Sequence, residues 1–164
     1  MLPEAVRAWK SDCHALTAST STVTGYDGTL RTSSDRRTWQ ERPIAAPPRA
    51  LAAAADGTLL ATTEAGLLRS TDDGATWSTL TPPEPAVLVA WADTSTVVAL
   101  TTGGRIATST DAGQSWTLGA TVLGEAGALS AGRTSEGSLE VIAVVGDTVI
   151  RTLDEGATTE VLVG

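Results

Sequence analysis

Short apolar runs alternate with turn-forming residues along the chain, and only the N-terminal "LPEAVRAW" weakly keeps the period of a helix. Runs such as "TLLATTEA" and "TVVALTTG" are bounded by Gly, Asp or Ser, which is typical of strands joined by tight turns. The pattern predicts four groups of four short antiparallel strands, at about 13–43, 48–82, 85–121 and 125–164. Pro-rich "RPIAAPPR" and "TPPEPA" separate the first three groups, since Pro interrupts strand pairing.

One acidic motif recurs in each group: "GTLRTSSDRRTW" (28–39), "GLLRSTDDGATW" (66–77), "GRIATSTDAGQSW" (104–116) and "DTVIRTLDEGATTEV" (147–161). Aligned on Asp35, Asp72, Asp111 and Asp154, the copies are 37, 39 and 43 residues apart, the period of a propeller blade. Asp can accept hydrogen bonds from the next few backbone N–H groups, and Gly tolerates positive φ. The motif therefore predicts a turn between the third and fourth strands of each blade, with Thr76 and Trp77 on opposite faces of the fourth strand. The fold class expected is an all-β propeller, with four blades encoded in the chain.

These motifs resemble the Asp-box, or BNR repeat, with the pattern Ser/Thr-x-Asp-x-Gly-x-Thr/Ser-Trp. The match is complete at Ser70, Asp72, Gly74, Thr76 and Trp77, and at Ser109, Asp111, Gly113, Ser115 and Trp116. It is partial at Ser33, Asp35, Thr38 and Trp39, and at Thr152, Asp154, Gly156 and Thr158. The chain looks most like bacterial, actinobacterial-type BNR proteins labelled glycosyl hydrolase or sialidase-like, and is similar to photosystem II assembly factor and sortilin-type propellers. The resemblance implies structural turns at the blade periphery, away from the central pocket.

A sialidase-like site would, by this resemblance, need an Arg cluster, a Tyr nucleophile with a Glu partner and an Asp acid/base. Tyr26 is the only Tyr and lies in "GYDG", which is typical of a turn with an anchoring aromatic. The Phe/Tyr-Arg-Ile-Pro motif of such enzymes is absent. Arg31, Arg69 and Arg151 precede the acidic turns, where we expect structural or solvent-facing roles; a ligand-gripping set is the alternative. We assign no catalytic residue.

Other candidate sites are few. Asp72-Asp73 and Asp154-Glu155 could bind Ca²⁺, but turn formation is the simpler interpretation, so we expect no metal and no cofactor. Cys13 and His14 lack the further groups that a nucleophilic site needs, and one Cys excludes an internal disulfide. Trp91 and Tyr26 are the two candidate ligand-facing aromatics, with core packing as the alternative for Trp91.

The net charge of -8 argues against binding to nucleic acid or anionic membranes. No apolar run is long enough to span a bilayer, and no signal core is present. We therefore expect a cytoplasmic protein as written, or an extracytoplasmic one if it is a fragment of an exported relative. Residues 1–12 are expected to be an N-terminal segment or extra outer strand, and 13–164 the propeller domain.

Four blades leave two flanks uncovered unless the ring closes, so we favour a homo-oligomer or part of a longer propeller over a closed ring of four. The function expected is a non-catalytic binding or assembly module for a protein or glycan. The alternative is a sialidase-like glycosidase whose site is completed by another chain or by missing blades.

Overall fold

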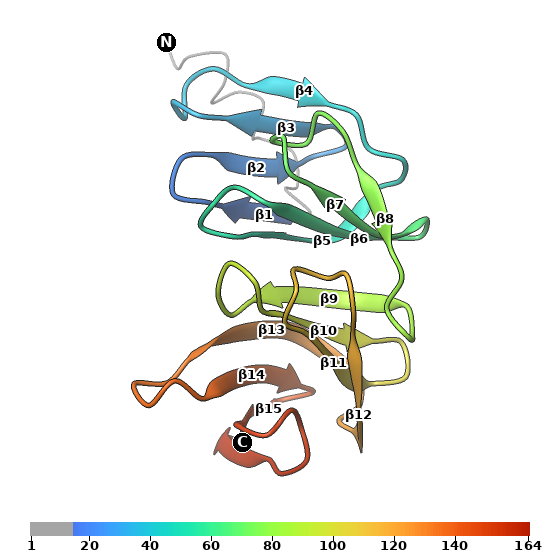
Figure 1. The fold of residues 1–164 in the computed structure, drawn as a ribbon, viewed down its shortest axis with the longest axis vertical. Coiled ribbons are helices and arrows are strands. Elements are labelled where there is room, and N and C mark those ends of the chain that lie inside the picture. The colour runs from blue at the N-terminus through green and yellow to red at the C-terminus, as the bar shows by residue number, and fades with distance from the viewer. Residues whose placement is uncertain (1–14) are drawn as a thin grey trace. The chain divides into compact units, whose positions relative to one another are not determined.

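The computed structural model describes residues 15–164, so the predictions for residues 1–12, Cys13 and His14 lie outside the described residues. The regular secondary structure of residues 15–164 consists of β-strands alone. These sixteen strands form four sheets of four, each with its strands hydrogen-bonded in chain order (Figure 1). The prediction of an all-β propeller with four four-stranded antiparallel blades is confirmed.

The chain divides into two compact units, Met1–Thr79 and Leu80–Gly164. Sheet 1 and sheet 2 belong to the first unit, except that the last residue of β8 falls in the second. Sheet 1 comprises β1 (Ala15–Ala18), β2 (Val23–Tyr26), β3 (Leu30–Ser33) and β4 (Gln40–Arg42). Sheet 2 comprises β5 (Pro48–Ala53), β6 (Leu59–Thr63), β7 (Gly66–Ser70) and β8 (Ser78–Leu80).

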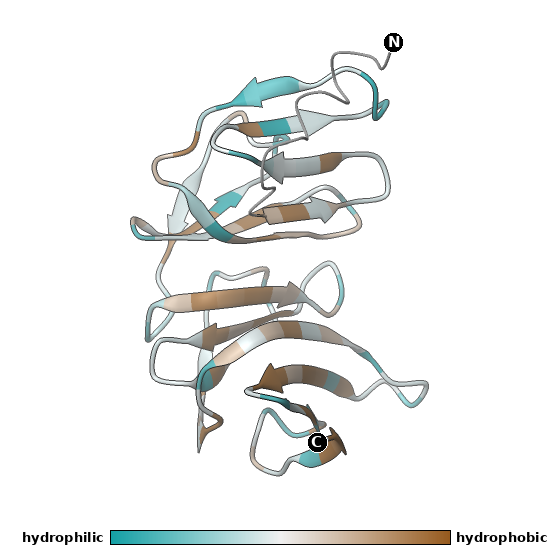
Figure 2. Ribbon diagram, turned by 180° about the vertical axis from the view of Figure 1, so that it is seen from behind, coloured by the Kyte–Doolittle hydropathy of each residue, from teal (hydrophilic) through white to brown (hydrophobic). Residues whose placement is uncertain are grey.

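The second unit contains sheets 3 and 4. Sheet 3 comprises β9 (Ala86–Trp91), β10 (Val97–Thr101), β11 (Arg105–Ser109) and β12 (Thr117–Val122). Sheet 4 comprises β13 (Ala126–Arg133), β14 (Leu139–Val145), β15 (Thr148–Thr152) and β16 (Glu160–Val163). Figure 2 shows apolar residues concentrated on β9 and β14, while β4 is hydrophilic.

Each sheet has two faces, because successive side chains of a strand point to opposite sides. On the third strands, face A carries Arg31, Leu68, Ala107 and Ile150, and face B carries Leu30, Leu67, Ile106 and Val149.

The sheets of the first unit pack with face B of sheet 1 against face A of sheet 2. Leu30 and Ala15 of sheet 1 form a core with Leu51, Ala61 and Leu68 of sheet 2. The N–H of Ala53 donates to Thr17 Oγ1 at 2.9 Å and so joins the first strands of the two sheets.

The second unit repeats this order. Val98 and Ile106, on face B of sheet 3, pack with Val141 on face A of sheet 4. Leu100 packs with Ala126 and Ala143 in a second cluster. Blade stacking therefore follows one rule in both units: face B of one sheet covers face A of the next.

Candidate functional site

The acidic motifs form the turns between the third and fourth strands of the sheets. In sheet 2, Ser70 Oγ donates to Asp72 Oδ1 at 2.8 Å, and the Gly74 N–H donates to Ser70 Oγ at 2.9 Å. Asp72 also accepts the Thr76 N–H on Oδ1 (2.9 Å) and the Thr76 hydroxyl on Oδ2 (2.5 Å). The carboxylate thus ties the start of the turn to its end.

Sheets 3 and 4 contain the same network. Asp111 accepts from Ser109 Oγ and from the Ser115 N–H, both at 2.8 Å, and from the Ser115 hydroxyl at 2.5 Å. Asp154 accepts from Thr152 Oγ1 and the Thr158 N–H at 2.8 Å, and from the Thr158 hydroxyl at 2.6 Å. The structure therefore brings together the Ser/Thr, Asp and Thr/Ser positions of each motif.

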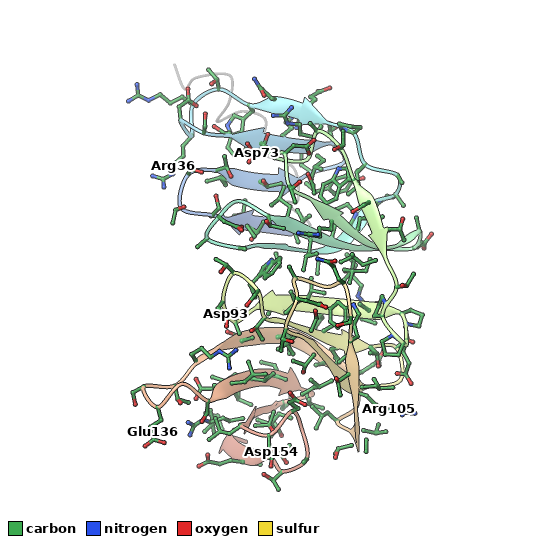
Figure 3. The ribbon with its side chains drawn as sticks, in the orientation of Figure 1. Arg36, Asp73, Asp93, Arg105, Glu136 and Asp154 are labelled. Carbon is green, nitrogen blue, oxygen red and sulfur yellow. The ribbon has the colours of Figure 1, made fainter. Side chains whose placement is uncertain are left out.

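The backbone of these turns also repeats. The residue after each Asp lies in the left-handed region, with φ of 57° to 59°: Arg36, Asp73, Ala112 and Glu155. Gly follows in sheets 2 to 4, at φ of 81° to 91°. Non-Gly residues rarely adopt such φ values, so the hydrogen-bonded Asp holds a conformation that the chain otherwise disfavours. Figure 3 labels Arg36 and Asp73 at two of these positions.

The turn of sheet 1 is one residue shorter and lacks the Gly. Asp35 compensates by accepting two backbone N–H groups, from Arg37 at 2.8 Å and Thr38 at 2.7 Å, besides the Thr38 hydroxyl at 2.8 Å. Ser33 Oγ still donates to Asp35, at 3.1 Å. The degraded motif therefore keeps the carboxylate network without the Gly.

Hydrogen bonding lowers the pKa of all four carboxyl groups. The Thr76 hydroxyl and N–H, then Ser70, lower the pKa of Asp72 from 3.8 to about 2. Ser115, then Ser109, lower that of Asp111 to about 2. The pKa of Asp154 falls mainly through Thr158, and that of Asp35 mainly through the N–H groups of Thr38 and Arg37. A general acid needs a raised pKa, so these groups suit fixed acceptors better than proton donors.

Two Trp side chains close their own turns. Trp77 Nε1 donates to the carbonyls of Gly74 (3.1 Å) and Pro43 (2.8 Å), and Trp116 Nε1 donates to that of Gly113 (2.9 Å). Thr76 and Trp77 precede β8, which begins at Ser78, so the expectation that both lie on the fourth strand is wrong. The reason is that Asp72 holds Thr76 within the turn. Trp39 is half-buried at the corresponding place in sheet 1.

Among residues 15–164, no group of three or more His, Cys, Asp or Glu side chains is arranged to hold a metal ion. Asp73 and Glu155, the second acids of two motifs, occupy the left-handed positions of their turns. Asp73 Oδ1 accepts from Thr22 Oγ1 at 3.5 Å, a long hydrogen bond to sheet 1.

The three Arg residues that precede the turns lie in different registers. Arg31 is two residues before Ser33, whereas Arg69 and Arg151 immediately precede Ser70 and Thr152. Arg31 therefore points from the opposite face of its sheet. Arg31 NH1 contacts both carboxylate oxygens of Asp27, at 2.8 and 2.7 Å, and Arg151 Nε donates to Glu140 at 2.6 Å. Arg31 and Arg151 thus form ion pairs within their own sheets.

Tyr26, one of the two candidate ligand-facing aromatics, lines an open groove of about 270 Å³. The groove lies between the β2–β3 hairpin and the segment that leads from β4 to β5. Its lining residues are Tyr26, Gly28, Thr29, Leu30, Arg42, Ile44, Ala45, Ala46 and Pro47. Tyr26 and Ile44 also pack against the core that joins sheets 1 and 2, so the groove has a fixed apolar wall.

Arg42 also lines this groove, and two polar side chains of sheet 1 hold its guanidinium. Its Nε donates to Thr32 Oγ1 at 3.0 Å and its NH2 to Gln40 Oε1 at 2.9 Å. Within residues 15–164, no carboxylate forms an ion pair with it. Sequence reasoning missed Arg42, Ile44 and Pro47, although the Pro-rich "RPIAAPPR" marked this connection.

Trp91, the other aromatic candidate, is half-buried at the end of β9, opposite Val97. It is not among the residues that line the Tyr26 groove. The structure therefore places the two aromatics in separate units of the chain.

Sequence reasoning also missed an ion pair between Arg133 and Asp93, which joins sheets 3 and 4. Arg133 Nε donates to Asp93 Oδ2 at 3.0 Å, and Arg133 NH2 donates to Thr96 Oγ1 at 2.8 Å. Burial alone would raise the pKa of Asp93, but the N–H groups of Ser95 and Thr96, with Arg133, hold it well below its ordinary value. Asp93 is labelled in Figure 3. The pair links two blades, and nothing about it requires a ligand.

No helix in the described part of the chain has the length and apolarity needed to span a membrane. Comparison with curated proteins finds no significant match. Solved structures share the fold. YCF48 bound to D1 peptide is 16% identical, with a TM-score of 0.67, and the match covers 92% of this chain and 54% of that one. YCF48 from Cyanidioschyzon merolae is 19% identical, with a TM-score of 0.61, and the match covers 94% of this chain and 57% of that one.

The GH74 enzyme of Niastella koreensis is 18% identical, with a TM-score of 0.65, and the match covers 91% of this chain and 30% of that one. The chain thus spans little more than half of the YCF48 structures and about a third of the GH74 enzyme. A sequence model described as the DUF6242 beta propeller domain matches residues 6–151, most of the chain. The chain belongs to the DUF6242 beta propeller domain family.

Proposed function

We propose that this protein is a non-catalytic propeller module that binds an extended segment of a protein partner in the Tyr26 groove. The observation that carries the proposal is the groove itself, which combines an apolar wall of Tyr26, Ile44 and Pro47 with Arg42 among its lining residues. Small binding sites are typically apolar surfaces with a few polar groups that fix orientation. A YCF48 propeller with a bound peptide shares the fold, which supports a peptide over a glycan.

The partner segment that best suits the groove carries a large apolar side chain and a carboxylate. The apolar side chain would pack on Tyr26, and the carboxylate would pair with Arg42, which has no acidic partner in residues 15–164.

We further propose that the four acidic turns are Asp-boxes of the BNR type and that their role is structural. Support comes from the repeated acceptor network at Asp72, Asp111 and Asp154 and from its lowered pKa values. Carboxylates engaged in this way are unsuited to glycoside hydrolysis, which requires a protonated acid beside a second carboxylate. The division into residues 1–12 and a domain of 13–164 stays a proposal.

The test is a peptide array and a glycan array probed with the purified chain, followed by titration of the peptides that bind. Replacing exposed Ala45, which lines the groove, by Gln should fill the groove and weaken peptide binding by about tenfold or more, since each 1.4 kcal/mol of lost contact is tenfold.

The matched control is Ala55→Gln, an equally small, exposed position in the β5–β6 turn that does not line the groove, and it should bind normally. Peptide binding that both variants retain would contradict the groove assignment. Turnover of fluorogenic glycosides that Tyr26→Phe abolishes would instead favour a glycosidase.

A further inference from the structure

The stacking rule of the blades leaves one face without a covering sheet in the second unit. Face B of sheet 1 and face B of sheet 3 are covered by face A of the following sheet, and Leu30 and Ile106 on those faces are each 1% exposed. Face B of sheet 4 carries Val149 at the same position, and this residue is half-buried.

Three further apolar residues extend the surface around Val149. Ile142 and Val144 on β14 share its face, and both are half-buried. Val163 on β16 is paired with Val149 and is 65% exposed. At the chain end of Figure 2, β16 is largely hydrophobic, unlike β4, the corresponding strand of sheet 1. An exposed apolar patch on a sheet face is typical of an interaction surface.

A complementary surface lies on face A of sheet 1. Leu16 on β1 is 60% exposed, and Val23 on β2 is half-buried. The equivalent residues of sheet 2, Leu51 and Leu59, are 9% and 1% exposed. In sheet 2 the apolar residues of face A are buried by the preceding sheet. The equivalent apolar residues of sheet 1 have no such cover among the described residues of the first unit.

We propose that face B of sheet 4 receives face A of sheet 1 from a second copy of this chain. Both surfaces belong to one chain, and the stacking rule makes each the partner of the other, so two copies would cover all four surfaces at once. The junction would repeat the contact that joins sheets 3 and 4, with Val149, Ile142 and Val163 against Leu16 and Val23. It does not depend on the Tyr26 groove.

The number of blades favours a pair over a longer series. Propellers typically contain about 4–8 blades, so two copies give a number within that range and three copies do not. The chain also spans 54% and 57% of the two YCF48 propellers, so a pair would have about the length of those folds.

Charge gives the association a distinctive salt dependence. Each copy has a net charge of -8, so two copies repel one another. The side chains proposed to meet at the junction are apolar, and the Arg residues that share their faces, Arg31 and Arg151, are paired with acids of their own sheets. Added salt screens the repulsion without weakening the apolar contact. The fraction of paired chains should therefore rise between low salt and physiological salt.

The experiment is light scattering with native mass spectrometry at tens of micromolar. The 164-residue chain should show twice its mass of 16.7 kDa. Val163→Glu on face B and Leu16→Lys on face A should each weaken pairing by about tenfold or more, because each places a charge in the apolar contact. Both side chains are exposed, so the fold should tolerate the changes.

Val122→Glu is the matched control, since Val122 is 63% exposed on β12 and lies on neither proposed surface. It should pair as the unaltered chain does. An equimolar mixture of Leu16→Lys and Val163→Glu chains should form mixed pairs, since one junction is then unaltered and the other sets Lys against Glu. The proposal would be overturned if the unaltered chain is a monomer or forms open assemblies larger than a pair. It would also be overturned if the pair survives both substitutions or is lost only with Val163→Glu.

Discussion

Gly104→Ala should lower the free energy of unfolding by about 3 kcal/mol, the largest effect that we expect from the addition of one methyl group. Gly104 lies in the β10–β11 hairpin at φ +72°, where an L side chain costs about 1–2 kcal/mol. An added Cβ would also lie 3.0 Å from the backbone N of Gly124. Backbone cannot move aside as a side chain does, because the Gly104 carbonyl accepts the Leu123 N–H at 2.7 Å.

Urea denaturation of the two chains measures this difference. Gly137→Ala is the matched control, since Gly137 has φ +85° in the β13–β14 hairpin but has no atom within 4 Å of an added Cβ. It should show the backbone strain alone, about 1 kcal/mol. Equal losses for the two variants would contradict the role that we assign to the Gly104–Gly124 contact.

Asp111→Asn should lower the melting temperature by several degrees at neutral pH. The side-chain NH₂ of Asn cannot accept the Ser115 hydroxyl, and the remaining hydrogen bonds lose their charged acceptor. Calorimetry measures the effect. Asp147→Asn is the matched control, because it removes the same charge from an exposed position in the β14–β15 turn. Equal melting temperatures for Asp111→Asn and the control would argue against a structural role.

The same comparison has a defined pH dependence. The folded-state pKa of Asp111, about 2, is below its ordinary value of 3.8, so the carboxylate stabilises the fold fully above 3.8. This contribution is lost as the pH falls toward 2. The difference in melting temperature between the unaltered chain and Asp111→Asn should therefore shrink over that interval.

Much of the architecture follows from the repeated motif. Asp and Gly at fixed spacing encode a turn through local hydrogen bonds, so strand, turn and strand can be predicted from neighbouring residues. The position of the turn at Asp35 could also be predicted from the sequence. The two N–H groups that donate to its carboxylate could not, because the motif there lacks the Gly. Strand alternation extended through the turn wrongly places Trp77 on the fourth strand, which begins at Ser78.

The groove and the Arg residues could not be predicted in the same way. Tyr26 and Pro47 meet only because a hairpin and the following crossing segment fold together, and no short-range pattern records that contact. The sequence itself shows that Arg31 and Arg151 differ in register by one residue, which places their side chains on opposite faces. The acids that pair with them, Asp27 and Glu140, are not marked by any local pattern. Asp93 and Arg133 are 40 residues apart, on different sheets, which likewise leaves no local signal.

The structural role of the acidic turns is tested most directly by an NMR titration of the Asp side-chain carboxyl carbons. Asp72 and Asp111 should titrate near pH 2, and Asp154 below its ordinary value of 3.8, because hydroxyl and N–H donors stabilise their ionised forms. Titration of Asp72 or Asp111 at or above the ordinary value would contradict the closed network and would restore these carboxyl groups as candidates for acid/base chemistry.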